Sequence, residues 1–356
     1  MAHVPSLAAS VDVLDASFAS DNSAGVAPEV AAALAAAGGG FCAAYGDDEA
    51  SREAGRLLAE QFGPGIAAYF VGTGTAANVL AIGSLAQPGD QVLVASSAHA
   101  YNDEAGAIEA LTRCAMRPLP HGAGKVEPDA LRGALSRRLS VHESVPAILS
   151  LAQATELGTV YTPRELSELC AIAHDHGLLV HLDGARLANA AAALEVSLAD
   201  VSFGCGVDAL SLGTSKNGTM SGEVVLLRPN GRNGPAPAAI AARLHKQLGQ
   251  LHSKQRYLAA QVAAVLRDEC WRSNALTANA AARRLAQGLE SIGATISYPV
   301  RANAVFATLD PETVARLRSR YLLLDGPAPG EVRFMTSYAT TPARIEELLD
   351  IAAAGA

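Results

Sequence analysis

Residues 178–186 read Leu-Leu-Val-His-Leu-Asp-Gly-Ala-Arg, an apolar run that ends in two charged side chains. The run from Leu178 to Leu182 is short, apolar and followed by a glycine, which predicts a buried β-strand. In parallel sheets the carboxyl ends of the strands form the crevice in which ligands bind. We therefore expect Asp183 and Arg186 to project into a binding site.

A second strand-like run, residues 208–212, leads into Gly-Thr-Ser-Lys-Asn-Gly at residues 213–218. A lysine on a Gly/Ser-rich loop after a buried strand is typical of a lysine that forms a Schiff base with a cofactor. Such a cofactor also needs an aspartate to pair with its pyridinium nitrogen. Taken alone, Lys216 is typical of a solvated loop and Asp183 of a turn. Their order and spacing together favour a cofactor site.

Lysines are scarce, because only Lys125, Lys216, Lys246 and Lys254 occur among the 27 basic residues. Any chemistry that needs a primary amine therefore has four candidates. Lys125 lies in a polar turn, and Lys246 and Lys254 fall on a predicted long basic helix that no strand precedes. Lys216 is the candidate that remains.

The segment Gly-Thr-Gly-Thr-Ala-Ala-Asn at residues 72–78 lies between an apolar run and a predicted helix. Backbone N–H groups at a helix N-terminus, with small residues and hydroxyls beside them, suit one phosphate group. The segment lacks the GK[ST] of a Walker A loop and the third glycine of a dinucleotide fingerprint. An ordinary strand-to-helix turn is the other interpretation. His99 follows the next strand-like run and is the histidine best placed to stack on an aromatic ring and relay protons.

Predicted strands and helices alternate along the chain from residue 28 onward. We expect strands at 66–71, 91–94, 147–151, 178–182, 208–212 and 223–227, and helices at 49–62, 75–85, 104–111, 128–139 and 164–176. This pattern predicts an α/β domain with a mostly parallel sheet. Residues 230–237, rich in Gly, Pro and Asn, form the best candidate linker. Long predicted helices at 238–266 and 275–289, strand-like pieces at 304–309 and 332–336, and a last helix ending at residue 354 predict a smaller α+β C-terminal domain.

The composition excludes several classes of partner. Basic residues number 27 and acidic residues 35, a net charge of −8, so we expect no nucleic acid and no anionic membrane as partner. The five cysteines form no CxxC pair, and His174 and His176 do not share a helix face, so we expect no metal site. The first 17 residues lack a basic n-region, and the uncharged residues 30–46 are too short to span a bilayer. These features predict a cytoplasmic protein.

Seven pieces of the sequence carry a resemblance to a known family. They are Phe-Ala-Ser-Asp-Asn at 18–22, Ala-Tyr-Gly-Asp-Asp at 44–48, Thr-Gly-Thr-Ala-Ala-Asn at 73–78, His99 with Glu104, His-Leu-Asp-Gly-Ala-Arg at 181–186, Thr-Ser-Lys-Asn-Gly at 214–218, and Val-Arg-Phe at 332–334. In this order they resemble the low-specificity L-threonine aldolases, which are pyridoxal 5'-phosphate (PLP) enzymes of the aspartate-aminotransferase fold, fold type I. The resemblance runs from about residue 18 to the C-terminus, and the pieces around Asp183 and Lys216 are the specific ones.

The resemblance implies a division of the chain and a seven-stranded sheet. We expect an N-terminal arm at residues 1–30, a PLP-binding large domain at 31–248 built on a mostly parallel seven-stranded sheet, and an α+β small domain at 249–356. The family also implies a homo-oligomer, a homotetramer built as a dimer of dimers, with active sites shared between subunits.

Residue roles follow from the same resemblance. Lys216 forms the Schiff base, Asp183 pairs with the pyridine nitrogen, and His99 stacks on the ring. The phosphate is held by Thr73, Gly74 and Thr75, and the substrate carboxylate by Arg186 and Arg333 together with Ser20 and Asn22. Tyr45, toward the substrate, and the stretch from Lys246 to Lys254, toward the cofactor, are segments that family members contribute across a dimer interface.

The proton acceptor is the role in which this chain departs from the commoner family pattern. The family reads Glu-Asn-Thr-His-Asn where residues 151–156 read Leu-Ala-Gln-Ala-Thr-Glu. In an ungapped alignment from Val160, Gln153 falls on the family histidine that is often discussed as a base. A branch of the family with Gln-Ala-Thr-Glu looks similar throughout. Our hypothesis gives the base role to His99 or an ordered water, with Glu104 as a supporting carboxylate.

The implied reaction is a retro-aldol cleavage of a β-hydroxy-α-amino acid between Cα and Cβ. L-threonine and L-allo-threonine, cleaved to glycine and acetaldehyde, are the leading substrates. An L-phenylserine aldolase, a β-eliminating lyase and a transaminase use similar machinery and stay open. From other classes, a nucleotide-binding oxidoreductase and a catalytically silent PLP- or nucleotide-binding protein also stay open.

Overall fold

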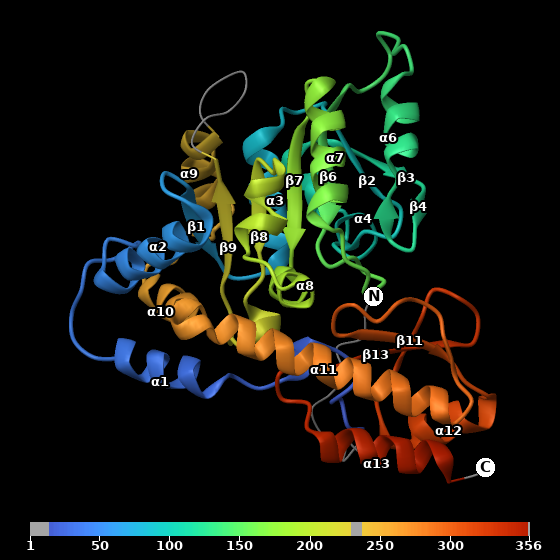
Figure 1. Ribbon diagram of the computed structural model, residues 1–356. Helices are drawn as coiled ribbons and strands as arrows, with labels where there is room; N and C mark the ends of the chain where they lie inside the picture. The colour runs from blue at the N-terminus through green and yellow to red at the C-terminus, as the bar shows by residue number, and fades with distance from the viewer. Residues whose placement is uncertain (1–13, 229–236, 355–356) are drawn as a thin grey trace, which may run out of the picture.

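The computed structural model describes residues 14–228 and 237–354, and a seven-stranded sheet forms its larger part (Figure 1). The strands, in their order across the sheet, are β1 (Ala67–Val71), β9 (Glu223–Leu227), β8 (Ala209–Leu212), β7 (Leu179–Gly184), β6 (Pro146–Ala152), β2 (Gln91–Ala95) and β3 (Ala115–Leu119). Only β9 runs antiparallel to its neighbours β1 and β8 in this sheet. The expected mostly parallel seven-stranded sheet is confirmed.

Both faces of this sheet are covered by helices, because its strands are apolar on both sides. Leu93, Leu149 and Val224 pack with one group of helices. Val92, Ile148 and Val225, each next to one of these residues in the chain, pack with the other group. The first group is α2 (Glu49–Phe62), α6 (Pro128–Leu135), α7 (Pro163–Asp175), α8 (Leu187–Leu194) and α10 (Arg256–Leu266); the second is α3 (Gly74–Leu85), α5 (Ala107–Thr112) and α9 (Pro237–Gln247). Near-continuous apolar strands are typical of a sheet buried on both faces.

A smaller antiparallel sheet forms the C-terminal part, as expected. Its order is β10 (Thr295–Ile296), β11 (Ala304–Thr308), β13 (Glu331–Met335) and β12 (Leu324–Asp325), and it packs with α11 (Cys270–Ser291), α12 (Pro311–Arg320) and α13 (Pro342–Ala353). Phe18, fully buried, joins the core of this part, and a bridge pairs Asp15 with Tyr321. The residues around Asp15 and Phe18 therefore pack against the C-terminal part. The next element along the chain, α1 (Pro28–Ala37), packs along α10 in the larger part (Figure 1).

Three expected helices are wrong in their limits. The helix expected at 104–111 begins only at Ala107, because Ala105 and Gly106 take left-handed conformations, and α4 (His99–Asn102) precedes the break. The single helix expected at 238–266 is two helices, α9 and α10. Gly249 takes a positive φ between them, and the side-chain oxygen of Gln250 accepts the Gly72 N–H at 2.9 Å. The helix expected at 128–139 ends at Leu135.

The edge strand β3 has no counterpart among the expected strands. Its sequence, Ala-Met-Arg-Pro-Leu, contains a charge and a proline, which lower the strand signal. An edge strand tolerates both, because one side of its backbone needs no partner strand.

Of the candidate linker at 230–237, residues 230–236 lie outside the described residues. The division at residues 30 and 248 stays a prediction.

Within the described ranges, no helix is long and apolar enough to cross a bilayer. All five cysteines are unpaired. Cys114, Cys170 and Cys205 are buried, whereas Cys42 is exposed.

Candidate active site

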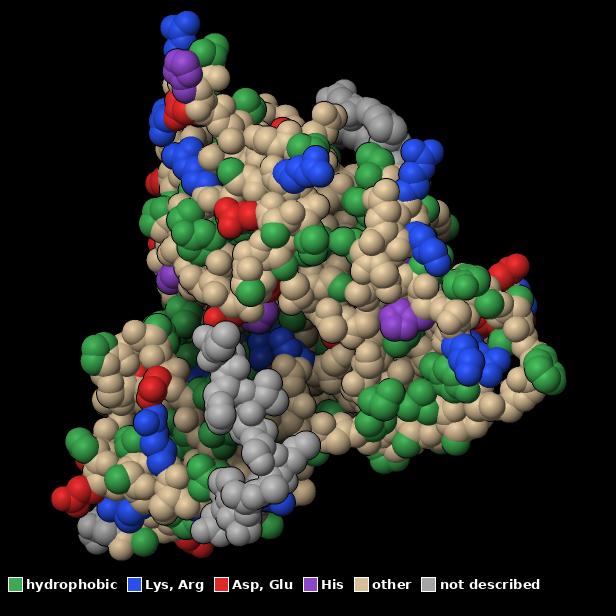
Figure 2. Space-filling model, turned by 180° about the vertical axis from the view of Figure 1, so that it is seen from behind, with side chains coloured by type: hydrophobic (Ala, Val, Ile, Leu, Met, Phe, Trp, Pro, Cys, Tyr) green, Lys and Arg blue, Asp and Glu red, His purple; other side chains and the backbone are tan. Residues whose placement is uncertain are grey.

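The carboxyl ends of five strands deliver the predicted site residues to one edge of the large sheet. Strands β2, β6, β7 and β8 run parallel, and β1 shares their direction because both β1 and β8 are antiparallel to β9. Two adjoining cavities of about 330 and 230 Å³ lie at this edge, and both are lined by His99, Asp183 and Lys216. Figure 2 shows this side of the molecule hollowed between its two parts, with Lys or Arg and His side chains within the hollow.

Lys216 lies on a short 3-10 turn, Ser215–Asn217, which begins three residues after the end of β8. Its pKa is held below the ordinary value, first by the charge of Arg186 and then by burial, while Asp21, Asp183 and Glu223 oppose the shift. Glu223 fixes the loop by accepting the Thr214 N–H at 2.6 Å. A buried lysine with a lowered pKa carries more of the neutral amine that attacks a carbonyl group.

Asp183 is joined to the histidine side of the pocket through Asn78. The Asn78 amide donates to Asp183 Oδ2 and to Glu104 Oε1, both at 2.9 Å. Nδ1 of His99 in turn lies 3.1 Å from Glu104 Oε1. The hydrogen bond to Glu104 raises the pKa of His99, although burial opposes it. Asn78, which we did not predict, therefore links a carboxylate suited to a pyridine nitrogen with an imidazole suited to a ring face.

His181 lies behind Asp183 and is fully buried between two hydroxyls. Its Nδ1 lies 2.9 Å from Ser150 Oγ, and its Nε2 lies 3.0 Å from Ser211 Oγ. Burial lowers the pKa of His181 to about 4, so its ring stays neutral at pH 7. Because this imidazole is neutral, it does not form an ion pair with Asp183, and the Asp183 carboxylate can interact with a cationic group in the pocket.

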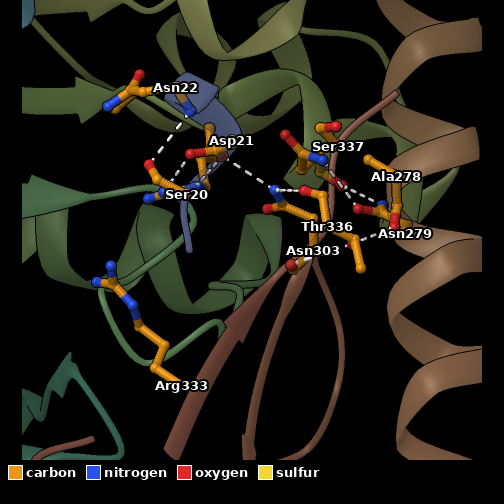
Figure 3. A network of polar contacts seen from close by, with 12 residues as sticks. Ser20, Asp21, Asn22, Ala278, Asn279, Asn303, Arg333, Thr336 and Ser337 are labelled. Atoms are coloured by element: carbon orange, nitrogen blue, oxygen red, sulfur yellow. Dashed lines mark hydrogen bonds and ion pairs between the residues drawn. The ribbon is translucent and has the colours of Figure 1, made fainter. Parts of the chain in front are cut away.

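Arg186 is fixed by a buried ion pair with Asp21. Its Nε and Nη2 donate to the two oxygens of Asp21 at 2.7 and 2.8 Å, and the Asp21 side chain is fully buried. Asn303 donates to the same carboxylate at 2.9 Å (Figure 3). Burial alone would raise the pKa of Asp21, but the charges of Arg186 and Lys216 hold it below its ordinary value. Asp21 was not predicted, although it lies inside the quoted segment 18–22.

Arg333 comes to the same cavity from β13 of the small sheet. It lines the cavity with Ser20 and Arg186, and its Nη2 donates to the carbonyl of Ala19 at 3.3 Å. Its Nε is buried without a hydrogen-bond partner among the described residues. In Figure 3, Arg333 and Ser20 both lie to the left of Asn303 and Thr336. Two guanidinium groups and a serine hydroxyl therefore meet where a carboxylate could bind.

The predicted phosphate loop lies at the N-terminus of α3. Gly72, Thr73, Gly74 and Thr75 line the larger cavity, and Asn22 lines both. The Thr73 hydroxyl accepts the Ala76 N–H at 3.2 Å, which caps the helix and leaves its first N–H groups for a ligand.

Two predicted residues do not line the pocket of their own chain. Tyr45 is 54% exposed, and the ammonium of Lys246 lies 4.9 Å from its ring centre. Lys254 lies in the connection between α9 and α10 rather than on a helix, and neither cavity includes it. Their roles across a subunit interface stay predictions.

Gln153 is a structural residue in this fold. Its amide donates to the Tyr161 carbonyl at 2.8 Å and accepts the Tyr161 N–H at 3.0 Å, and its side chain is fully buried. Neither cavity is lined by it. The residue of this loop that brings an ionisable group to the smaller cavity is Glu156, which sequence reasoning missed.

The chain is similar to known proteins in both sequence and fold. The model of the Beta-eliminating lyase family matches residues 17–312. The chain is 38% identical over 334 residues to a low specificity L-threonine aldolase of Pseudomonas aeruginosa, covering 93% of this chain and 95% of that protein. A solved threonine aldolase of Leishmania major superposes with a TM-score of 0.87 at 28% identity, covering 95% of this chain and 98% of that one.

The fold itself is shared more widely. A serine palmitoyltransferase from S. paucimobilis, solved with PLP and myriocin bound, superposes with a TM-score of 0.68 at 20% identity, covering 96% of this chain and 86% of that one. The expected fold type I architecture is confirmed, and PLP is bound in a protein that shares it.

Proposed function

Because the chain belongs to the low-specificity L-threonine aldolase family of beta-eliminating lyases, we propose that it is a PLP-dependent aldolase. The reaction is cleavage of L-threonine, L-allo-threonine and related β-hydroxy-α-amino acids to glycine and an aldehyde. One observation carries the proposal: the two adjoining cavities at the sheet edge together hold an amine, a carboxylate, an imidazole, a helix N-terminus and two guanidinium groups.

The residues of the pocket fit PLP by their chemistry. Lys216 would supply the amine for the aldehyde of PLP. Asp183, held by the Asn78 amide and the Ala185 N–H, would supply a carboxylate for the pyridine nitrogen. The loop from Thr73 to Thr75 supplies the N–H groups and hydroxyls for the phosphate. When bound there, PLP withdraws electrons from the bonds at the substrate Cα.

The remaining residues decide which bond breaks. Arg186 and Arg333, with Ser20 and Asn22 beside them, bind the substrate carboxylate and hold it away from the reacting position, which exposes the Cα–Cβ bond to cleavage. Arg186 binds Asp21 through Nε and Nη2, so Nη1 remains for the substrate. His99, which is held by Glu104, would pack on the ring of the cofactor and donate a hydrogen bond toward the substrate oxygen.

We also propose a homotetramer, a dimer of dimers in the cytoplasm, in which Tyr45 and Lys254 reach the active site of the partner subunit. The exposed Tyr45 side chain supports the contact, and five unpaired cysteines support a reducing compartment.

The test is product analysis with the purified holoenzyme. L-threonine should give glycine and acetaldehyde in equal amounts. Ammonia with 2-oxobutanoate would instead indicate a β-eliminating lyase, and an amino-group transfer to an added oxo acid would indicate a transaminase. A faster reaction with L-phenylserine than with threonine would make phenylserine the preferred substrate.

A further inference from the structure

Glu156 has a carboxylate oxygen that forms no hydrogen bond with any part of the chain that the structure describes. It lies on the loop after β6 and lines the smaller cavity with His99, Asp183 and Lys216. Its Oε1 accepts the backbone N–H of His99 at 2.8 Å, whereas its Oε2 is buried with no partner among the described residues. A buried unsatisfied oxygen is costly, which indicates that its partner comes from the contents of the cavity.

The surroundings of Glu156 suit a group that exchanges a proton near neutral pH. Its pKa is raised to about 7, chiefly by burial and also by the charge of Asp183, while the backbone N–H and the charge of His99 oppose the shift. The other ionisable groups that face it are Asp103, Glu104, Tyr161, Arg186, Lys216 and Arg333. A carboxylate with such a pKa can accept and release a proton at the working pH.

His99, to which our hypothesis gave the base role, and Gln153, which stands at the family histidine position, are less suited to accept a proton. The hydrogen bond to Glu104 raises the pKa of His99 and so favours the imidazolium, which donates rather than accepts. Gln153 has no basic group, and its amide is bound to Tyr161 at both ends.

Resting on the proposed function, we infer that the Glu156 carboxylate accepts the proton of the substrate β-hydroxyl. The O–H bond breaks and its proton passes to Oε2 of Glu156, while the oxygen electron pair forms the aldehyde C=O. The Cα–Cβ bond breaks, its electron pair stays on Cα, and a proton from water completes glycine. Glu156 then releases its proton to water before the next turnover.

The test compares Glu156→Gln and Glu156→Asp with Glu168→Gln, a surface control on α7 that pairs with Arg132. Two reactions are measured on each holoenzyme: acetaldehyde release from L-threonine, and exchange of a glycine Cα proton with D₂O, which involves no hydroxyl. Glu156→Gln should lower kcat for threonine about 100-fold, within the range of a lost general base. Its glycine exchange and cofactor absorbance should stay within about threefold of wild type.

The pH dependence gives a second, independent readout. In wild type, kcat for threonine should fall below an apparent pKa of about 7, because Glu156 must be deprotonated to accept a proton. Glu156→Asp should keep this acid limb with part of the activity, and Glu156→Gln should lose it. Infrared spectroscopy of the holoenzyme should show a carboxylic acid C=O band that titrates over the same range and is absent in Glu156→Gln.

Several outcomes would overturn the inference: threonine cleavage within threefold of wild type in Glu156→Gln, an equal loss of glycine exchange, or an infrared band unchanged by the substitution. A wild-type enzyme that exchanges the glycine proton but releases no aldehyde from threonine or phenylserine would overturn the proposed function itself, and this inference with it. Glu168→Gln should match wild type in every measurement.

Discussion

The buried ion pair between Asp21 and Arg186 gives the sharpest quantitative prediction. Asp21→Asn keeps the shape of the side chain but removes the charge that faces Nε and Nη2 of Arg186. It leaves Arg186 unpaired in a pocket that already holds Lys216 and Arg333. Neutralising one partner of a buried pair costs about 3–5 kcal/mol of stability, and we take about 3 because 17% of the Arg186 side chain remains exposed.

That loss converts into a measurable temperature shift. Unfolding entropies of about 2.1 cal/mol/K per residue give about 0.75 kcal/mol/K for 356 residues. A loss of about 3 kcal/mol therefore lowers Tm by about 4 °C. Because Arg186 also loses its fixed orientation, KM for L-threonine should rise about tenfold, whereas the absorbance of bound PLP should remain.

A matched surface pair provides the control. Arg320 and Glu347 also form an ion pair, but their side chains are 57% and 43% exposed. Solvent screens such a pair, so Glu347→Gln should shift Tm by less than about 1 °C and leave KM unchanged. A Tm and KM of Asp21→Asn as close to wild type as those of the control would refute the reasoning.

The stability that the Asp21–Arg186 pair contributes should also depend on pH in a defined direction. Burial opposes ionisation of Asp21, yet Arg186 and Lys216 hold its pKa below the ordinary value. A lowered pKa gives stability that is present above the ordinary value of about 4 and is lost as pH falls through the folded value. The Tm gap between wild type and Asp21→Asn should therefore be constant above about pH 5 and narrow only in acid.

Three further predictions concern single residues and assembly. His99→Asn should lower kcat for threonine at least tenfold but keep the acid limb near pH 7, and a limb that vanishes with His99 would return the acceptor role to it. Gln153→Leu should lower Tm, because two buried backbone groups of Tyr161 lose their partner, and should leave the pH profile unchanged; a shifted profile would contradict a structural role. If Tyr45 and Lys254 act across subunits, activity per chain should fall as gel filtration shows dissociation on dilution, and a fully active monomer would exclude sharing.

The sequence predicts best where local pattern and fold requirement coincide. The strands around Leu182 and Leu210 are short, buried, mostly apolar runs, and each is followed by a polar loop, so the position of both loops at one edge follows from parallel pairing. Lys216 and Asp183 could therefore be placed in one site before any distance was known. Strand β3 was not predicted, because its proline and arginine, which an edge strand tolerates, weaken the apolar pattern from which a strand is predicted.

The missed residues depend on contacts between distant parts of the chain. Asp21 meets Arg186 and Asn303 across 165 and 282 positions, and no local spacing reports such a contact. Asn78 carried a weak signal, since it lies one turn after Thr75 on the helix that opens the phosphate loop. The helix break at Ala105 could not be predicted, because the apolar residues keep the spacing of a helix through it. The break nevertheless brings Glu104 to His99 and Asn78.

The most direct test of the account maps where PLP is attached while the reaction is measured. Holoenzyme reduced with borohydride should lose threonine cleavage and carry the label on the peptide that contains Lys216. Lys216→Ala should lose the cofactor absorbance and acetaldehyde release together. Lys125→Ala should keep both, because the ammonium of Lys125 is bound to Glu165 and lines neither cavity of the site. Label on another lysine, or undiminished acetaldehyde release by Lys216→Ala, would contradict the central claim.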